Sequence, residues 1–228
     1  MPTSGTTAFT LDLAEIIEES YERCGAEMLN GYDFRTARRS LNLLFMDWAN
    51  RGVNLWTLDS SSIPLLTGVG TYNLPEDTVD LLDCAIRTNP GDVPRQQDLP
   101  ISRVSFVTYN TIPNKLSQSR PLQMLVKRNV GVPTVTVWPV PADDTYTFVY
   151  WRLRRMQDAG TGATTHDVPF RLIPALTSGL AYYLSFKVKD ALVRAEMLKA
   201  VYEEDWTRAS DEDREKAPVR IVPYVGRL

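Results

Sequence analysis

Histidine and cysteine are scarce in this chain of 228 residues, which contains one histidine and two cysteines. The cysteines, Cys24 and Cys84, lie far apart and form no CxxC pair, so the sequence suggests neither a disulfide framework nor a cysteine-type zinc site. We expect two reduced, buried thiols. The single histidine, His166, precedes Asp167, which is better explained as a helix cap than as the partner of a general base.

Motifs of nucleophilic catalysis and phosphate binding are also missing. No serine lies in GxSxG or SxxK, and there is neither GxxxxGK[ST] nor GxGxxG after a strand. Two acidic clusters, Asp143-Asp144 and residues 211–213, lack the alternating oxygen ligands and central glycine of a calcium loop and are interpreted as a turn and a solvated helix face. We therefore predict no catalytic, cofactor-binding or metal-binding residues, and no cofactor.

The chain has no excess of positive charge, because it contains 25 Lys and Arg and 28 Asp and Glu, which gives a net charge of -3. Dedicated nucleic-acid binders depend on many phosphate contacts, so this balance argues against that class. Long apolar runs are absent too. The longest uncharged run, residues 172–186, spans roughly 22 Å as a helix, which is shorter than a bilayer core of about 30 Å. We expect a soluble protein without membrane association.

Apolar residues at three- and four-residue spacing predict two helices near the N-terminus. The first covers about residues 11–24 with Thr10 as its cap, and the second covers about 34–51 with Asp33 as its cap. Helical spacing returns after residue 167. One helix is predicted from near Pro169, and another covers 191–215 with Asp190 as its cap.

Between these helical segments the period changes to that of β-strands. Alternation is clearest in residues 146–154, where Phe148 and Tyr150 would point to one face and Trp151 to the other. A short helix capped by Ser102 is predicted over 102–110, and glycines suggest hairpin connections at 67–70 and 129–133. The predicted strands are 54–58, 63–66, 71–74, 83–88, 122–127, 134–138 and 146–154.

This order of elements predicts an α+β fold, in which N- and C-terminal helices form a helical bundle around an inserted antiparallel β-rich domain. The predicted parts are an N-terminal helical hairpin over 1–52, the β-rich domain over 53–156, a C-terminal hairpin over 157–216 that packs with the first, and an extended arm over 217–228.

Two sets of charged residues with opposite sign are candidates for subunit contacts. Four glutamates lie on the first helix and three arginines near the start of the second, and they could pair within the chain or between neighbouring subunits. Exposed pairs contribute at most about 1 kcal/mol each, so apolar contacts must supply most of the stability of an assembly. The candidates are Glu15, Glu18, Glu19, Glu22, Arg35, Arg38 and Arg39.

The C-terminal arm is unusually apolar for a chain end, since disordered termini are normally dominated by polar residues. It either folds back on its own domain or docks on a partner as an extended strand. Its candidate contact residues are Val219, Arg220, Ile221, Val222, Tyr224, Val225 and Leu228.

Four runs of this sequence form a specific pattern: YDFRTARRSLNLLFMDWANRGVNLW at 32–56, GTYNLPEDTVDLLD at 70–83, VYWRLRR at 149–155 and DVPFRLIPALTSGLAYY at 167–183. They resemble the head-to-tail adaptor proteins of short-tailed bacteriophages. The resemblance extends from about Leu11 to Pro218 and includes no chemical motif.

The resemblance implies a structural virion protein in the neck or tail, assembled in the host cytoplasm. Such a protein forms a homo-oligomeric ring, usually of twelve copies, below the portal protein. It extends the DNA channel and joins the capsid to a tail nozzle or tail tube protein. The family's C-terminal arm often reaches along the portal, which here would involve residues 217–228. Genomic DNA must slide through without specific binding, and a slightly acidic chain suits that passage.

Two other functions stay open at this stage. The chain could be a monomeric module that binds a host protein. It could also be a cell-wall hydrolase that uses two carboxylates about 5 to 9.5 Å apart, one of them with a raised pKa. Asp143 and Asp144 are the most visible pair for that chemistry.

Overall fold

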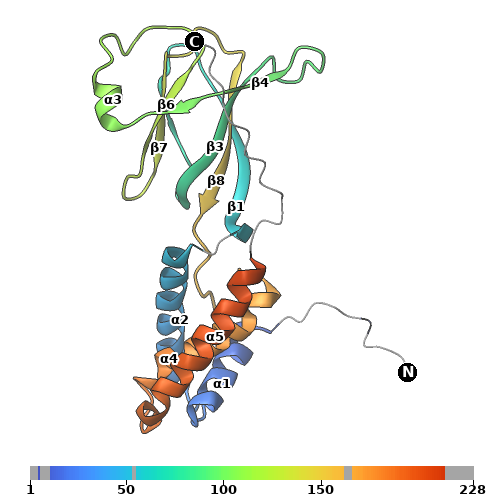
Figure 1. Ribbon diagram of the computed structural model, residues 1–228, viewed down its shortest axis with the longest axis vertical. Coiled ribbons are helices and arrows are strands. Elements are labelled where there is room, and N and C mark those ends of the chain that lie inside the picture. The colour runs from blue at the N-terminus through green and yellow to red at the C-terminus, as the bar shows by residue number, and fades with distance from the viewer. Residues whose placement is uncertain (1–4, 6–10, 53–54, 162–165, 214–228) are drawn as a thin grey trace, which may run out of the picture. The chain divides into compact units, whose positions relative to one another are not determined.

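The computed structural model describes residues 5, 11–52, 55–161 and 166–213, and the chain forms two compact units (Figure 1). Both chain ends, Met1–Trp56 and Met156–Leu228, make up the helical unit, and Thr57–Arg155 makes up the β unit. Helices before and after a strand-rich segment confirm the predicted α+β class. No helix in the described part of the chain is long and apolar enough to cross a membrane.

The first helix, α1 (Leu13–Cys24), begins with a reciprocal cap. The Asp12 carboxylate accepts the backbone N–H of Glu15 at 2.8 Å, and the Glu15 carboxylate accepts the N–H of Asp12 at 2.8 Å. The helix therefore starts at Leu13 with Asp12 as its cap. Thr10, the predicted cap, lies outside the described residues.

The second helix, α2 (Gly31–Arg51), also begins with a capping box, and here the prediction of Asp33 as the cap is wrong. The cap is Asn30, whose side-chain oxygen accepts the N–H groups of Tyr32 and Asp33. The Asp33 carboxylate reaches back to the N–H groups of Leu29 and Asn30. Asp33 is thus the third residue of the helix and completes the cap from inside it.

The apolar segment after residue 167 forms a 3-10 turn, η2 (Phe170–Leu172), followed by α4 (Ile173–Ser185). Pro174 lies in the first turn of α4, where its missing N–H has no intrahelical partner to lose. The α4 helix is the most buried of the unit and packs against α1 and α2 as well as α5, which explains why its sequence is apolar nearly all round.

The last helix begins later than predicted. Residues Ala191–Arg194 form a 3-10 turn, η3, and α5 covers Ala195–Glu212. Asp190 has a left-handed backbone with φ of 64° and makes no capping hydrogen bond, so the prediction of Asp190 as a helix cap is wrong. An aspartate tolerates this conformation better than most residues, and here it turns the chain from α4 toward α5.

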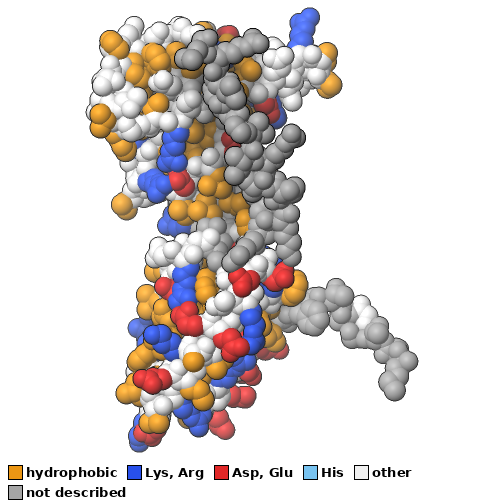
Figure 2. Space-filling view, viewed as in Figure 1, with side chains coloured by type: hydrophobic (Ala, Val, Ile, Leu, Met, Phe, Trp, Pro, Cys, Tyr) orange, Lys and Arg blue, Asp and Glu red, His pale blue; other side chains and the backbone are white. Residues whose placement is uncertain are grey.

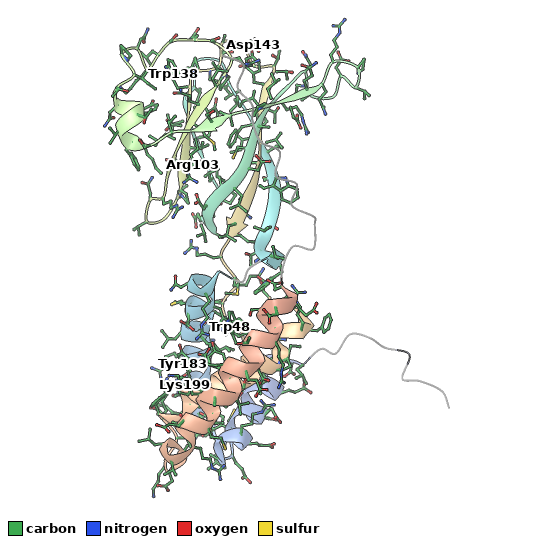
Figure 3. All side chains as sticks on the ribbon, viewed as in Figure 1. Trp48, Arg103, Trp138, Asp143, Tyr183 and Lys199 are labelled. Carbon is green, nitrogen blue, oxygen red and sulfur yellow. The ribbon has the colours of Figure 1, made fainter. Side chains whose placement is uncertain are left out.

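The core of the helical unit contains a group of aromatic side chains between α2 and α5, near Trp48 in Figure 3. Trp48 is fully buried, and its indole N–H donates to the Tyr202 hydroxyl at 2.9 Å. Its ring lies 4.9 Å from that of Trp206. The Arg51 guanidinium lies over both the Tyr202 and Trp206 rings and is held there by the Glu203 carboxylate.

The β unit consists of two four-stranded sheets whose buried faces share one hydrophobic core. In β8, Phe148 and Tyr150 are buried while Trp151 is half exposed, which confirms the predicted alternation. One sheet has the order β1 (Leu58–Pro64), β8 (Tyr146–Arg154), β3 (Thr78–Thr88), β4 (Gln97–Pro100). The other has the order β2 (Thr71–Asn73), β7 (Thr134–Trp138), β6 (Gln123–Lys127), β5 (Ser102–Arg103).

Three local predictions in the β unit are wrong. Residues 102–103 are a strand, β5, which pairs in parallel with β6, and the short helix is α3 (Phe106–Asn110), capped by Ser105. The segment 67–70 is not a hairpin connection, because β1 and β2 belong to different sheets. Residues 55–57 form a 3-10 turn, η1 (Leu55–Thr57), instead of a strand. The hairpin at 129–133 is confirmed, since β6 and β7 pair antiparallel.

Candidate interaction surfaces

The glutamates of α1 form an exposed ridge on the helical unit. We call Glu15, Glu18, Glu19 and Glu22 the acidic ridge. Glu15 caps its own helix and Glu19 pairs with Arg23 at 2.8 Å. Within the described chain, the carboxylates of Glu18 and Glu22 have no hydrogen bond or ion pair. A hollow of about 470 Å³ follows the ridge and is lined on its other side by Ile173, Pro174 and Thr177 of α4.

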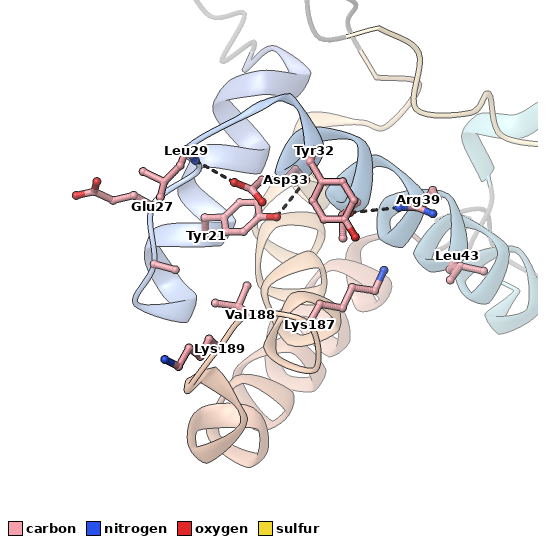
Figure 4. Close-up of a pocket in the computed structure, with 12 residues that line it drawn as sticks. Tyr21, Glu27, Leu29, Tyr32, Asp33, Arg39, Leu43, Lys187, Val188 and Lys189 are labelled. Atoms are coloured by element: carbon pink, nitrogen blue, oxygen red, sulfur yellow. Dashed lines mark hydrogen bonds between the residues drawn. The ribbon is translucent and has the colours of Figure 1, made fainter.

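A second, larger hollow of about 780 Å³ lies between the start of α2 and the turn after α4 (Figure 4). We call it the basic groove. Its apolar lining is unusually accessible, because Leu29 is 78%, Tyr32 63% and Leu43 52% exposed. Its cations are Arg39, Lys187 and Lys189.

Two cations of the basic groove have polar but uncharged partners among the described residues. Lys187 donates to the Ser40 hydroxyl at 2.7 Å, and Arg39 donates to the Thr36 hydroxyl at 3.3 Å. Burial and the nearby charge of Arg39 lower the pKa of Lys187. Two acids also line the groove: Asp33 accepts the backbone N–H groups described above, and Glu27 is exposed. The groove thus offers positive charge beside apolar surface.

The structure separates the three arginines predicted as subunit contacts. Arg39 lines the basic groove, whereas Arg38 donates to the carbonyl of Gly160 at 3.3 Å and Arg35 donates to the carbonyl of Gly31 at 3.3 Å. In the described part of the chain no glutamate of the acidic ridge pairs with any of them. The structure therefore does not pair the ridge with these arginines within one chain, and a contact between chains stays a prediction.

Sequence reasoning missed two of the three cations of the basic groove. Lys187 and Lys189 follow α4 at a point far from α2 in sequence, and no local pattern connects them to Arg39. The sequence signal lies on α2 alone, where Arg39 and Leu43 are four residues apart and therefore share one face of the helix. Figure 2 shows charged side chains of both signs gathered over the helical unit. The predicted portal-binding residues 219–228 lie outside the described part of the chain.

The candidates for catalysis have local structural roles. The Asp143 carboxylate accepts the N–H of Thr145 at 2.9 Å, so it stabilises a turn. The Asp144 carboxylate accepts the N–H and hydroxyl of Thr67, which lowers its pKa. A general acid needs a raised pKa, so these bonds argue against the most visible version of a hydrolase.

His166 is partly buried. Burial lowers its pKa, and its Nδ1 has no hydrogen-bond partner in the described structure. The Asp167 carboxylate accepts the N–H of Gln157 at 3.2 Å and is not a helix cap, which corrects the prediction. The described residues contain no group of three or more His, Cys, Asp or Glu side chains that could hold a metal ion.

A protein family described as SU10 adaptor protein matches residues 11–222, which include all described helices and strands of both units. No curated protein matches the chain.

Proposed function

The chain belongs to the SU10 adaptor protein family and is thus a structural component of a bacteriophage virion, and we propose that it acts as the head-to-tail adaptor. In this proposal twelve copies form a ring below the portal protein, extend the DNA channel and connect the capsid to a tail nozzle or tail tube protein. The family match over both units is the observation that carries the proposal.

The chemistry of the chain supports a role in which DNA passes without being held. The net charge is -3, and the cations of the basic groove share it with Glu27 and Asp33. A strongly basic lumen would retain the phosphate backbone by counterion release, which a channel for genome ejection has to avoid. We further propose that the protein works by assembly alone, without a catalytic step, and that genomic DNA makes no specific contact with it.

The C-terminal arm, residues 217–228, is the proposed contact with the portal. The proposal is supported by its apolar sequence, in which Arg220 and Arg227 are the only charged residues. An extended apolar segment of this kind can add to the edge of a partner's sheet or occupy a groove on it.

Purified portal and purified adaptor test the proposal directly. Mass photometry of the mixture should show multiples of this chain added to each portal ring. A protein that stays monomeric and does not bind portal rings would contradict the adaptor proposal and favour a monomeric binding module.

Deletion of residues 219–228 tests the arm. We expect weaker portal docking with an unchanged circular dichroism spectrum, because the proposed arm contributes to the partner contact and not to the core. A deletion variant that unfolds would instead mean that the arm folds back on its own domain. Replacement of Arg220 by alanine is the milder companion variant and should reduce docking without loss of fold.

A further inference from the structure

The helical unit carries two surfaces of opposite character that share no lining residue. The acidic ridge and its hollow are built from α1 and the start of α4. The basic groove is built from the end of α1, the α1–α2 connection, the start of α2 and the turn after α4, and it adjoins the ridge at a hollow that Glu22 shares with Glu27 and Leu29. Two copies of the chain could therefore join through the ridge of one and the groove of the other, which leaves a free groove on the first copy and a free ridge on the second.

The basic groove has the composition of a contact site with an acidic helix. Leu29, Tyr32 and Leu43 expose apolar surface that a partner would remove from water. Arg39 and Lys189 have no carboxylate partner in the described structure and can approach one from another chain. The groove volume of about 780 Å³ accommodates several side chains of a second copy.

The acidic ridge has the matching composition. Glu18 and Glu22 are exposed, lie four residues apart on one helix face, and are unpaired in the described chain. Leu11 and Pro174 lie beside them and are themselves exposed. The ridge therefore presents carboxylates together with apolar atoms, which complement the cations and the exposed apolar side chains of the groove.

We propose that the acidic ridge of one copy inserts into the basic groove of the next copy, and that this contact repeats around the ring. The inference rests on the proposed ring function and names the surfaces that build it. It assigns Arg39, Lys187 and Lys189, rather than Arg35 and Arg38, as the cations that meet the glutamates. A contact between two different surfaces is heterologous, and such contacts form a ring when the rotation between neighbouring copies closes after a whole number of copies.

Exposed apolar surface favours a second copy over nucleic acid as the occupant. Leu29, Tyr32 and Leu43 are exposed in the groove, and a phosphate backbone offers charge but no apolar side chains to cover them. An acidic helix surrounded by apolar atoms meets the groove cations and still buries Leu29 and Tyr32. The exposed apolar residues give such a contact most of its strength, and the charges give it its direction.

Disulfide crosslinking tests the geometry. Glu22→Cys and Lys189→Cys are made singly and together, on the isolated protein and on the portal complex; the native thiols, Cys24 and Cys84, are buried. The double variant should give a ladder of dimers, trimers and larger species under oxidation, and a mixture of the two single variants should give dimers only. Dimers from one single variant alone would mean a symmetric contact and would overturn the inference.

Charge reversal tests the energetics. Glu18→Lys with Glu22→Lys, or Arg39→Glu with Lys189→Glu, should each reduce assembly at least tenfold by mass photometry. The variant that carries all four changes should recover it. Glu204→Lys on α5 is the matched control, because Glu204 is an exposed helical glutamate outside both surfaces and should assemble like the unmodified chain.

The outcomes separate the two proposals. If the unmodified chain loads onto portal while both reversed pairs load equally well, the inference is wrong and the adaptor function stands. If the groove variant assembles normally but binds DNA less well than the unmodified chain, the groove contacts nucleic acid and the inference is also wrong. If the unmodified chain neither assembles nor binds portal, the adaptor function fails first and this inference fails with it.

Discussion

Gly179 is a point of close approach between α4 and its neighbours α2 and α5, so Gly179→Ala is a sharp test of the helical core. A Cβ atom at this position would lie 2.8 Å from the Tyr202 ring and 3.0 Å from a methyl group of Leu44. The Tyr202 ring cannot move aside easily, because its hydroxyl accepts the Trp48 indole N–H at 2.9 Å and Arg51 covers its face.

The expected magnitude follows from two opposing effects. Overpacking a well-filled core costs roughly 1–3 kcal/mol, and the restrained ring places this site near the upper end. Replacing glycine by alanine inside a helix returns about 1 kcal/mol through helix propensity. We therefore expect a net loss of about 2 kcal/mol in the free energy of unfolding. For a chain of this size that corresponds to a fall in Tm of roughly 4–8 °C.

The assay is thermal and urea unfolding followed by helical circular dichroism, with Gly31→Ala as the matched control. Gly31 is the first residue of α2, and a Cβ there would meet no atom within 4 Å. That variant should be unchanged or more stable by up to about 1 kcal/mol. A Gly179→Ala protein that is as stable as the unmodified chain would refute the steric argument and imply a looser contact of α4 with α5.

Three further predictions concern the helical unit. Trp48→Phe removes the donor to the buried Tyr202 hydroxyl and should cost roughly 1–3 kcal/mol in urea unfolding, whereas Trp151→Phe, at a half-exposed position, should cost little. Burial raises the pKa of Cys24 to about 11, so between about pH 9 and 11 the unfolded chain loses the thiol proton first and stability should fall as pH rises, with a smaller slope in Cys24→Ala. Asp213→Asn weakens a fully buried carboxylate that accepts the Arg171 guanidinium and should cost roughly 2 kcal/mol, while Asp158→Asn, at an exposed position, should leave the unfolding midpoint unchanged.

Strands with strong local signals were predicted well from the sequence. Strands β7 and β8 have the predicted bounds, because β-branched and aromatic residues there alternate over a full strand length. Strands β4 and β5 were missed, since QDLP and SR carry no such pattern. Their pairing with β3 and β6 gives them strand geometry, and that partner comes only from the tertiary fold.

Helix starts likewise depend partly on local sequence and partly on the tertiary fold. The capping role of Asp33 was misplaced because an aspartate before an apolar stripe is a good cap by itself. Asn30 three residues earlier also fits that role, and Asp33 then completes a capping box from the third helical position. Asp190 was misplaced for a different reason: the turn after α4 forces it into a left-handed backbone, which depends on where α5 packs.

The sequence by itself determined the α+β class, the signs of the two charged helices and the absence of common catalytic motifs, because period, charge and motif spacing are properties of neighbouring residues. Only the tertiary structure decided which cations meet in the basic groove. Lys187 reaches Ser40 of α2 across 147 positions of sequence, which places it beside Arg39 and leaves Arg38 outside. Packing of α4 against α2 brings these side chains together. A local sequence pattern cannot predict such a contact, because it depends on how two helices that are distant in sequence pack in one core.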